Sequence, residues 1–272
     1  IDIRDGSIVY INDIENDKMY KNWPTSLQDM LRAMYPGMLR NVRRNIFHLI
    51  MIIDPSKKEA HDIIKLAESF YIHKAPVRIG LIFAVTPDMS VDGFHDAGVA
   101  CLEAFNFVSQ EKSLYDGLSF LTDVIANVNS DSSEQRDLNP EDVINIFKKK
   151  YKSEDMEMVF GSDSDYDTGR RLAWEFINKT GIGSPIKVLL NGVVLKDTYL
   201  NAELFEEAVL TEIMKQTNTI QKAIYKGELI DSDNVLDWLM NQKNVMPRLN
   251  KLILNTENSL KYLELNNLES SL

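Results

Sequence analysis

Two strongly apolar stretches, Ile46–Ile53 (IFHLIMII) and Val77–Val85 (VRIGLIFAV), carry the aliphatic and β-branched side chains that are typical of buried strands. Between them, Ser56–Lys74 repeats its apolar residues at steps of three and four, which places them on one face of a helix. Ser56 and Glu59 have the spacing of a capping box at the start of that helix. A strand, a helix and a strand in this order predict a βαβ unit with parallel strands and a right-handed crossover.

A second group of elements is expected nearer the C-terminus. A helix at Thr168–Lys179 precedes two short strands, Ile186–Leu190 and Val193–Lys196. The pair Asn191-Gly192 joins the strands, and both residues tolerate the positive φ that a tight antiparallel hairpin requires. Another helix is expected from Ala202 to about Gln216. This part of the chain therefore has the order αββα.

Helical patterns fill the stretch between the two units, at His95–Gln110, Ser113–Val128 and Pro140–Tyr151. The order βαβ, helical insertion and αββα is that of the thioredoxin fold with a helical subdomain. We therefore expect an α/β, thioredoxin-like fold with amphipathic C-terminal helices. The expected divisions are residues 1–44 (a lead segment with a short helix near Ser26–Met34), 45–93 (the βαβ half), 94–165 (the helical insertion), 166–222 (the αββα half) and 223–272 (the C-terminal helical segment).

Composition excludes several classes of function. The chain has 272 residues, of which 44% are hydrophobic and 26% charged, as in ordinary globular proteins. Its 30 Lys and Arg against 41 Asp and Glu give a net charge of −11, so we expect no nucleic-acid partner and no acidic membrane surface. Its longest apolar run, Ile46–Ile53, is far shorter than the roughly 20 residues that cross a bilayer. The chain opens at Ile1 without a signal-peptide pattern, which indicates a segment of a longer protein.

Thioredoxin-like redox chemistry is not expected. It requires Cys-x-x-Cys where the first strand meets the first helix, because the helix N-terminus lowers the pKa of the thiol. This junction reads Asp54-Pro-Ser-Lys57, and the single cysteine, Cys101, sits among apolar residues of a helix, where a buried and inert thiol is expected. Pro185 precedes the hairpin at the place of the structural cis proline of thioredoxin-like domains, and we predict that role for it.

Acidic clusters offer only weak signals of a metal site. Asp163, Asp165 and Asp167 resemble the start of a calcium loop, but Thr168 and Trp174 stand where such a loop needs Gly and Glu. The Asp-x-Asp pairs here and at Asp231–Asp233 also match a pattern of metal-dependent glycosyltransferases. We interpret Asp167 or Thr168, and Asp231 or Ser232, as helix caps instead, and metal-dependent transfer as the least favoured alternative. No catalytic residue and no metal ligand is predicted.

Apolar residues near the C-terminus suggest a contact surface. Trp238, Leu239 and Met246 belong to amphipathic stretches beyond the αββα unit, and they either pack on the domain or remain available to a partner. Eleven methionines in all favour adaptable surfaces, because thioether side chains are flexible. Asn178-Lys-Thr180 is a glycosylation sequon, which matters only if the chain enters the secretory pathway.

Several stretches closely resemble one family, the UDP-glucose:glycoprotein glucosyltransferases, which are folding sensors of the endoplasmic reticulum. The resemblance covers almost the whole chain and implies its third thioredoxin-like domain. It is carried by Tyr10–Gly37 (YINDIENDKMYKNWPTSLQDMLRAMYPG), Arg43–Asn45 (RRN), Pro76–Gly80 (PVRIG), Val91–Gly98 (VDGFHDAG), Gln221–Tyr225 (QKAIY) and Asn241–Asn250 (NQKNVMPRLN).

This resemblance implies the endoplasmic reticulum lumen and a protein whose transferase domain, with its UDP-glucose and divalent cation, lies outside this chain. The segment itself would be non-catalytic and without a cofactor. It would bind hydrophobic surface on misfolded glycoproteins through an apolar groove, with Trp238, Leu239 and Met246 as contacts or as a cover. The alternative is a structural module that packs on neighbouring domains of the same polypeptide and positions the transferase.

Overall fold

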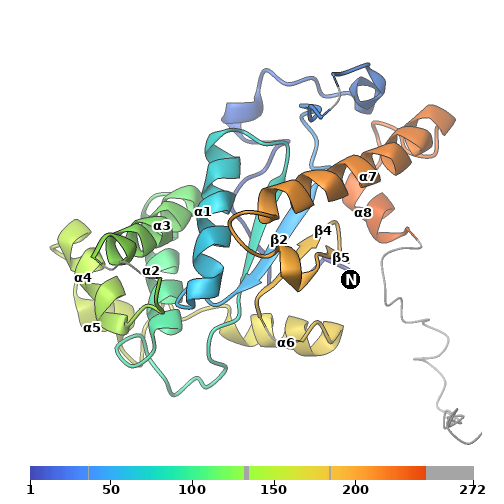
Figure 1. Cartoon of the computed structure of the whole chain (residues 1–272). Helices are drawn as coiled ribbons and strands as arrows, with labels where there is room; N and C mark the ends of the chain where they lie inside the picture. Colours follow the sequence, from blue (N-terminus) through green and yellow to red (C-terminus); the bar gives the residue numbers. More distant parts are fainter. Residues whose placement is uncertain (36, 132–134, 184, 243–272) are drawn as a thin grey trace, which may run out of the picture.

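The computed structural model describes residues 1–35, 37–131, 135–183 and 185–242, and the βαβ unit lies at its centre (Figure 1). β2 (His48–Ile53) and β3 (Arg78–Phe83) pair in parallel, and α1 (Lys58–Ile72) connects them. Every residue of β2 is buried, which explains its continuous apolar run. The predicted strand, helix and strand are confirmed.

The sheet has the order β1-β3-β2-β4-β5. The three outer strands each pair antiparallel with their neighbour; they are β1 (Val9–Tyr10), β4 (Lys187–Leu190) and β5 (Val193–Val194). Asn191 and Gly192 join β4 to β5 with φ of 49° and 80°, as a tight hairpin turn requires. The predicted hairpin is therefore confirmed.

Helices cover both faces of the sheet. Figure 1 shows α1 and α7 (Phe205–Lys226) in front of it and α6 (Arg170–Thr180) below it. The rings of Phe70 in α1 and Phe205 in α7 lie 6.4 Å apart. α7 continues past the expected end at Gln216, because Ile220, Ala223 and Ile224 extend its buried face. Gly227 then ends the helix in the left-handed conformation, with φ of 73°.

The helical insertion forms a second part of the same core. The helix α2 (Ala97–Glu111) is almost wholly buried, and its Phe105 ring lies 4.9 Å from Phe83 of β3, which joins the insertion to the sheet. The three expected helices are present within a few residues, and a short fourth follows them: α2 (Ala97–Glu111), α3 (Leu114–Asp131), α4 (Pro140–Lys150) and α5 (Met156–Phe160). No helix in the described part of the chain is long and apolar enough to cross a membrane.

The two ends of the described chain are held together. The carboxylate of Asp231 accepts hydrogen bonds from the backbone N–H of Leu27, at 2.6 Å, and from the hydroxyl of Ser26, at 2.9 Å. These bonds hold the pKa of Asp231 below its usual value. Asp231 therefore binds the first backbone N–H of the 3-10 helix η2 (Leu27–Leu31), whose N-cap is Ser26, and the expectation that Asp231 or Ser232 caps the following helix is wrong. That helix, α8 (Val235–Met240), has Asn234 as its N-cap.

Arg170 ties the loop after β3 to the start of α6. Its guanidinium is fully buried, pairs with Asp167, and donates to the carbonyl oxygens of Thr86, Asp88 and Val91 at 3.0 to 3.3 Å. The expected capping role of Asp167 or Thr168 is therefore wrong, because α6 begins after Gly169 and the Asp167 carboxylate binds Arg170 instead. Two further 3-10 turns, η1 (Lys18–Tyr20) and η3 (Asp197–Tyr199), complete the elements of the described chain.

Glu103 of α2 is a buried acid whose two carboxyl oxygens have no hydrogen-bond partner among the described residues. Burial, with a smaller contribution from Asp167, raises the pKa of Glu103 to about 9. The folded chain therefore keeps a proton on Glu103 that the unfolded chain, with a pKa near 4.3, releases above that pH.

We predict that Arg170→Met lowers the free energy of unfolding by about 3–5 kcal/mol, because it leaves Asp167 and three carbonyl oxygens without their partner. Urea unfolding of both proteins measures the loss. Arg171→Met is the matched control, since Arg171 is the next residue of α6 and its side chain is 82% exposed. Equal stabilities for the two variants would contradict a structural role of the buried guanidinium.

We also predict that Glu103→Gln removes part of the pH dependence of stability. Between about pH 4.5 and 9 the folded wild type binds more protons at residue 103 than the unfolded chain, so its stability falls as pH rises. The variant carries no such proton and should exceed the wild type at pH 8.5 by on the order of 5 kcal/mol, while matching it near pH 4.5. Urea unfolding across this range tests the prediction, with exposed Glu111→Gln on the same helix as control.

Candidate apolar binding groove

The position of the thioredoxin dithiol carries no thiol in this chain. Asp54 follows β2, and its Oδ1 accepts hydrogen bonds from the Ser56 N–H, at 2.9 Å, and the Ser56 hydroxyl, at 2.7 Å. Burial raises the pKa of Asp54. Asp54, Lys57 and Pro185 line one open groove of about 430 Å³. The position that corresponds to the thioredoxin dithiol therefore lies beside Pro185 in the structure. Oxygen and ammonium groups there supply no redox couple.

The structure leaves the prediction of a cis bond before Pro185 untested. The preceding residue, Ser184, lies outside the described residues. A cis peptide bond does occur one position later, between Pro185 and Ile186.

Cys101 lies elsewhere, fully buried in α2 as expected. Burial raises the pKa of its thiol well above the ordinary value, so it remains protonated. The three aspartates of the calcium-like motif also fail to converge on one point. Asp163 and Asp165 are exposed, whereas Asp167 binds Arg170. In the described residues no group of three or more His, Cys, Asp or Glu side chains is arranged to hold a metal ion.

Trp238 and Leu239 belong to α8, which packs beside α7. With Gln216 and Ile220 of α7 they line a cavity of only about 40 Å³. Leu239 is buried and Trp238 is half-buried, so much of this predicted contact surface is already covered by the domain itself. Met246, the third residue of that prediction, lies outside the described residues. Asn178 is exposed near the end of α6, where a glycan has room.

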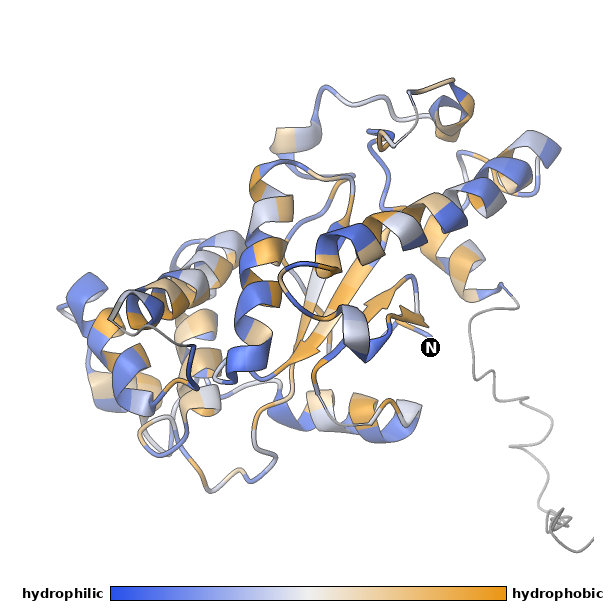
Figure 2. Cartoon of the chain, viewed as in Figure 1, coloured by the Kyte–Doolittle hydropathy of each residue, from blue (hydrophilic) through white to orange (hydrophobic). Residues whose placement is uncertain are grey.

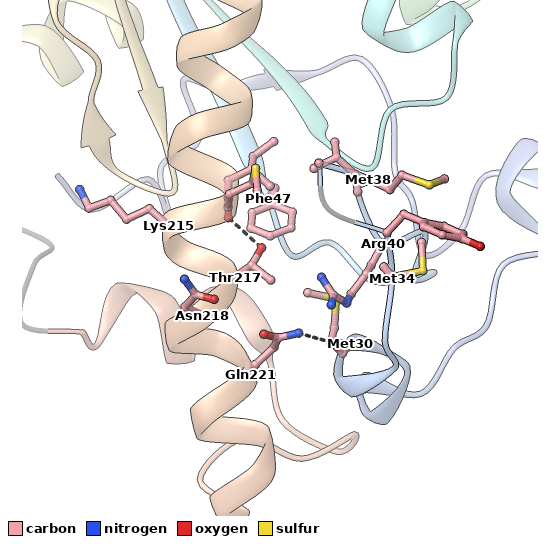
Figure 3. A pocket seen from close by; sticks show the side chains of 14 residues that line it. Met30, Met34, Met38, Arg40, Phe47, Lys215, Thr217, Asn218 and Gln221 are labelled. Atoms are coloured by element: carbon pink, nitrogen blue, oxygen red, sulfur yellow. Dashed lines mark hydrogen bonds between the residues drawn. The ribbon is translucent and has the colours of Figure 1, made fainter.

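A methionine-lined groove lies on another side of α7, between that helix and residues 30–35 and 37–40 of the lead segment. It has a volume of about 300 Å³, and Figure 3 shows its side chains. Its wall in the lead segment carries Met30, Met34 and Met38, and its helix wall carries Met214. We call this site the methionine groove. Its other lining residues include Tyr35, Leu39, Arg40, Phe47, Ile213, Lys215, Thr217, Asn218 and Gln221.

The groove has a fixed floor and an exposed rim. Gln221 of α7 donates to the carbonyl oxygen of Met30 at 2.6 Å, which joins the two walls, and Met30 is almost fully buried (Figure 3). The rim side chains are open to solvent: Met34 is 41% exposed, Met38 55% and Met214 49%. Tyr35 is 82% exposed. A floor held by packing, with several accessible apolar side chains above it, has the form of a binding surface.

A second apolar groove adjoins the first along α7. It has a volume of about 500 Å³ between α7 and the β5–η3 segment, and it exposes parts of Val194, Tyr199 and Leu204. Lys215 lines both grooves, so they are neighbours. Figure 2 shows how apolar and polar residues alternate along α7. One helix thus buries an apolar stripe on the sheet and offers further apolar side chains to solvent.

The methionine groove is absent from the sequence-based predictions, which placed the contact surface near the C-terminus. One signal for it exists in the sequence: Met30, Met34 and Met38 recur every four residues, followed far along the chain by Met214. Nothing in the sequence pairs these two regions, which come together only when α7 packs against η2.

A family model agrees with this architecture. The model of the family described as a thioredoxin-like domain matches residues 1–253. A solved structure from Pseudomonas syringae, described as a protein-disulfide isomerase, has a TM-score of 0.38 and 9% identity, over 72% of this chain and 92% of that one. That likeness is too low to bear on function.

Three relatives match over nearly the whole chain. The UDP-glucose:glycoprotein glucosyltransferase of Drosophila melanogaster is 46% identical over 98% of this chain. The UDP-glucose:glycoprotein glucosyltransferases 1 and 2 of Homo sapiens are each 36% identical, over 97% and 94% of it. In each case the chain spans 17% of the length of the relative. The chain therefore belongs to the thioredoxin-like domain family, in the form found within UDP-glucose:glycoprotein glucosyltransferases.

Proposed function

We propose that this chain is a client-sensing domain of a glycoprotein-folding quality-control glucosyltransferase in the endoplasmic reticulum lumen. In this proposal the methionine groove binds apolar surface that misfolded glycoproteins expose and native ones bury. The observation that carries the proposal is the rim of Met34, Tyr35, Met38 and Met214, which is open above a packed floor. Removing apolar area from water contributes about 25 cal/mol per Å² and requires no particular client sequence.

Methionine suits this role for a physical reason. Its side chain is unbranched and polarizable, so it adapts to ligands of different shape, whereas a rim of β-branched residues would select one shape. A sensor of folding meets many unrelated sequences, and a flexible, methionine-rich rim accommodates them. The fixed floor at Met30 and Gln221 keeps the groove open while the rim adjusts.

The chemistry of the residues supports a non-catalytic role in this proposal. At the position that corresponds to the thioredoxin dithiol, this chain has Asp54 and Lys57 in place of thiols. The candidate metal ligands Asp163 and Asp165 point to no common site with Asp167, so they do not fit the divalent cation of a glycosyltransferase. UDP-glucose and its cation would be held by another part of the parent protein. The competing proposal is a structural module, in which neighbouring domains of the same polypeptide cover the methionine groove.

We predict that the double substitution Met34→Gln, Met38→Gln weakens binding of a reduced and alkylated glycoprotein about tenfold, because two half-exposed apolar contacts are lost. The native form of the same glycoprotein should bind neither protein. Fluorescence anisotropy of the labelled glycoprotein measures both affinities. Met158→Gln is the matched control, since Met158 is 68% exposed on α5, away from the methionine groove.

The same experiment separates the two proposals. Binding of the misfolded form, lost in the double variant and kept in the Met158 control, supports sensing by the methionine groove. Absence of binding to either form by the wild-type chain favours the structural module, and then the two grooves along α7 are domain interfaces.

Location in the lumen leads to a further prediction. Expressed through the secretory pathway, the chain should carry a glycan at the exposed Asn178, seen as a gel shift that peptide N-glycosidase removes. Asn178→Gln should abolish the shift, and Thr180→Ser, which preserves the sequon, should retain it. A wild-type chain that reaches the lumen without a shift would contradict this prediction.

A further inference from the structure

We propose that the methionine groove prefers apolar segments that carry an acidic residue, and that Arg40 makes this selection. The inference rests on the proposed function of the same groove and narrows its ligand class. The proposed function requires only apolar contact between the groove and its ligand. The present inference adds that the ligand carries a negative charge. Three features of the described residues support it: the position of Arg40, the charges around it, and the charge of the chain as a whole.

Arg40 lies inside the groove and is only half-exposed. Figure 3 shows its guanidinium between the methionines of the lead segment and Gln221 of α7. Its Nε and one terminal nitrogen, Nη2, donate to the carbonyl oxygen of Arg32 at 3.4 and 3.2 Å. These two bonds orient the side chain while leaving the hydrogens of Nη1 directed elsewhere.

In the described part of the chain, Arg40 has no carboxylate within 4 Å. Its neighbours in sequence do: Arg32 pairs with Asp29 at 2.6 Å, and Arg44 lies 3.4 Å from Glu15. The residues lining the groove include Arg40 and Lys215 but no Asp or Glu. Lys215 is 3.3 Å from Glu212 on the same helix, so its charge is partly balanced. Arg40 is therefore the cation that the groove leaves available to a ligand.

A local cation is unusual in so acidic a chain. With a net charge of −11, the surface as a whole repels acidic ligands at long range. At physiological ionic strength, however, charges more than about 8 Å apart are largely screened. A ligand seated among Met34, Met38 and Met214 meets Arg40 at close range and the distant acids only weakly. Contact within the groove thus favours a carboxylate, which a guanidinium binds with two parallel hydrogen bonds.

The occupant that fits is a short peptide segment with apolar side chains for the methionine rim and one carboxylate for Arg40. In a folded glycoprotein such a segment is the buried face of an amphipathic element together with an adjoining acid. Misfolding exposes both at once. The apolar part contributes most of the binding free energy, and the ion pair decides between segments of equal hydrophobicity.

Three peptides with the same apolar sequence and Glu, Gln or Lys at one central position test the proposal. Fluorescence anisotropy measures their affinity for the wild-type chain, Arg40→Gln and Arg40→Glu. For the wild type we expect the Glu peptide to bind about fivefold more tightly than the Lys peptide, as for a part-exposed ion pair. Arg40→Gln should remove this preference and Arg40→Glu should reverse it. Arg171→Gln, which neutralises an exposed arginine on α6, should leave it unchanged.

A salt series on the wild-type chain is a second test, and it does not depend on whether the Arg40 variants fold. The preference for the Glu peptide should shrink toward equality at 0.5 M salt, where the screening length is only a few ångström, while binding of the Gln peptide persists. Equal affinity of the three peptides for the wild type at low salt overturns the role of Arg40 and leaves the apolar groove intact. Absence of binding by all three overturns the proposed function itself, and the inference with it.

Discussion

Complete burial of β2 is the constraint on which the rest of the structure depends. Its edges are paired to β3 and β4, and all six of its side chains are buried, so both faces of the sheet need a cover. α1 and α7 cover one face and α6 the other (Figure 1). The C-terminal half of α7 reaches beyond the sheet and packs on η2 through the Gln221–Met30 hydrogen bond (Figure 1). The methionine groove lies along this contact, so its existence follows from the way the central strand is covered.

Polar contacts between the two ends of the described chain decide where α8 lies. Asp231 accepts a hydrogen bond from the first N–H of η2, and Arg44 donates to the carbonyl oxygens of Asp231 and Asp233 at 2.9 and 3.1 Å. These bonds place α8 beside Gln216 and Ile220 of α7 rather than over the methionine groove. The half-buried Trp238 therefore contributes to the packing of the domain, while the exposed rim is formed by Met34, Met38 and Met214.

The thioredoxin-like scaffold is used here without its redox site. In a dithiol enzyme the N-terminus of α1 activates a thiolate, but Asp54 occupies the end of β2 and uses its carboxylate to bind Ser56. The one thiol, Cys101, is in the core. The surface that we propose for ligand binding lies instead along α7, where the exposed side chains are apolar and flexible. The proposed function, recognition of apolar surface instead of thiol–disulfide exchange, requires no change in the order of strands and helices.

Much of the fold could be predicted because its signals are local in the chain. The βαβ unit follows from two apolar runs around an amphipathic helix, and the hairpin from Asn191 and Gly192, whose positive φ values the turn requires. The candidate site could not be predicted in this way, because it joins Met30, Met34, Met38 and Arg40 to Met214 and Gln221, and no period or motif in the sequence marks that pairing. Asp231 shows the same limit: its place in the sequence suggests a cap for the next helix, whereas in the structure its carboxylate binds Ser26 and Leu27 at the start of η2, about 200 residues away in the chain. The sequence by itself thus determined the elements and their order, because backbone preferences and apolar periodicity act over a few residues. Only the tertiary structure decided which side chains meet, because burial and hydrogen bonding act between residues that are distant in the chain.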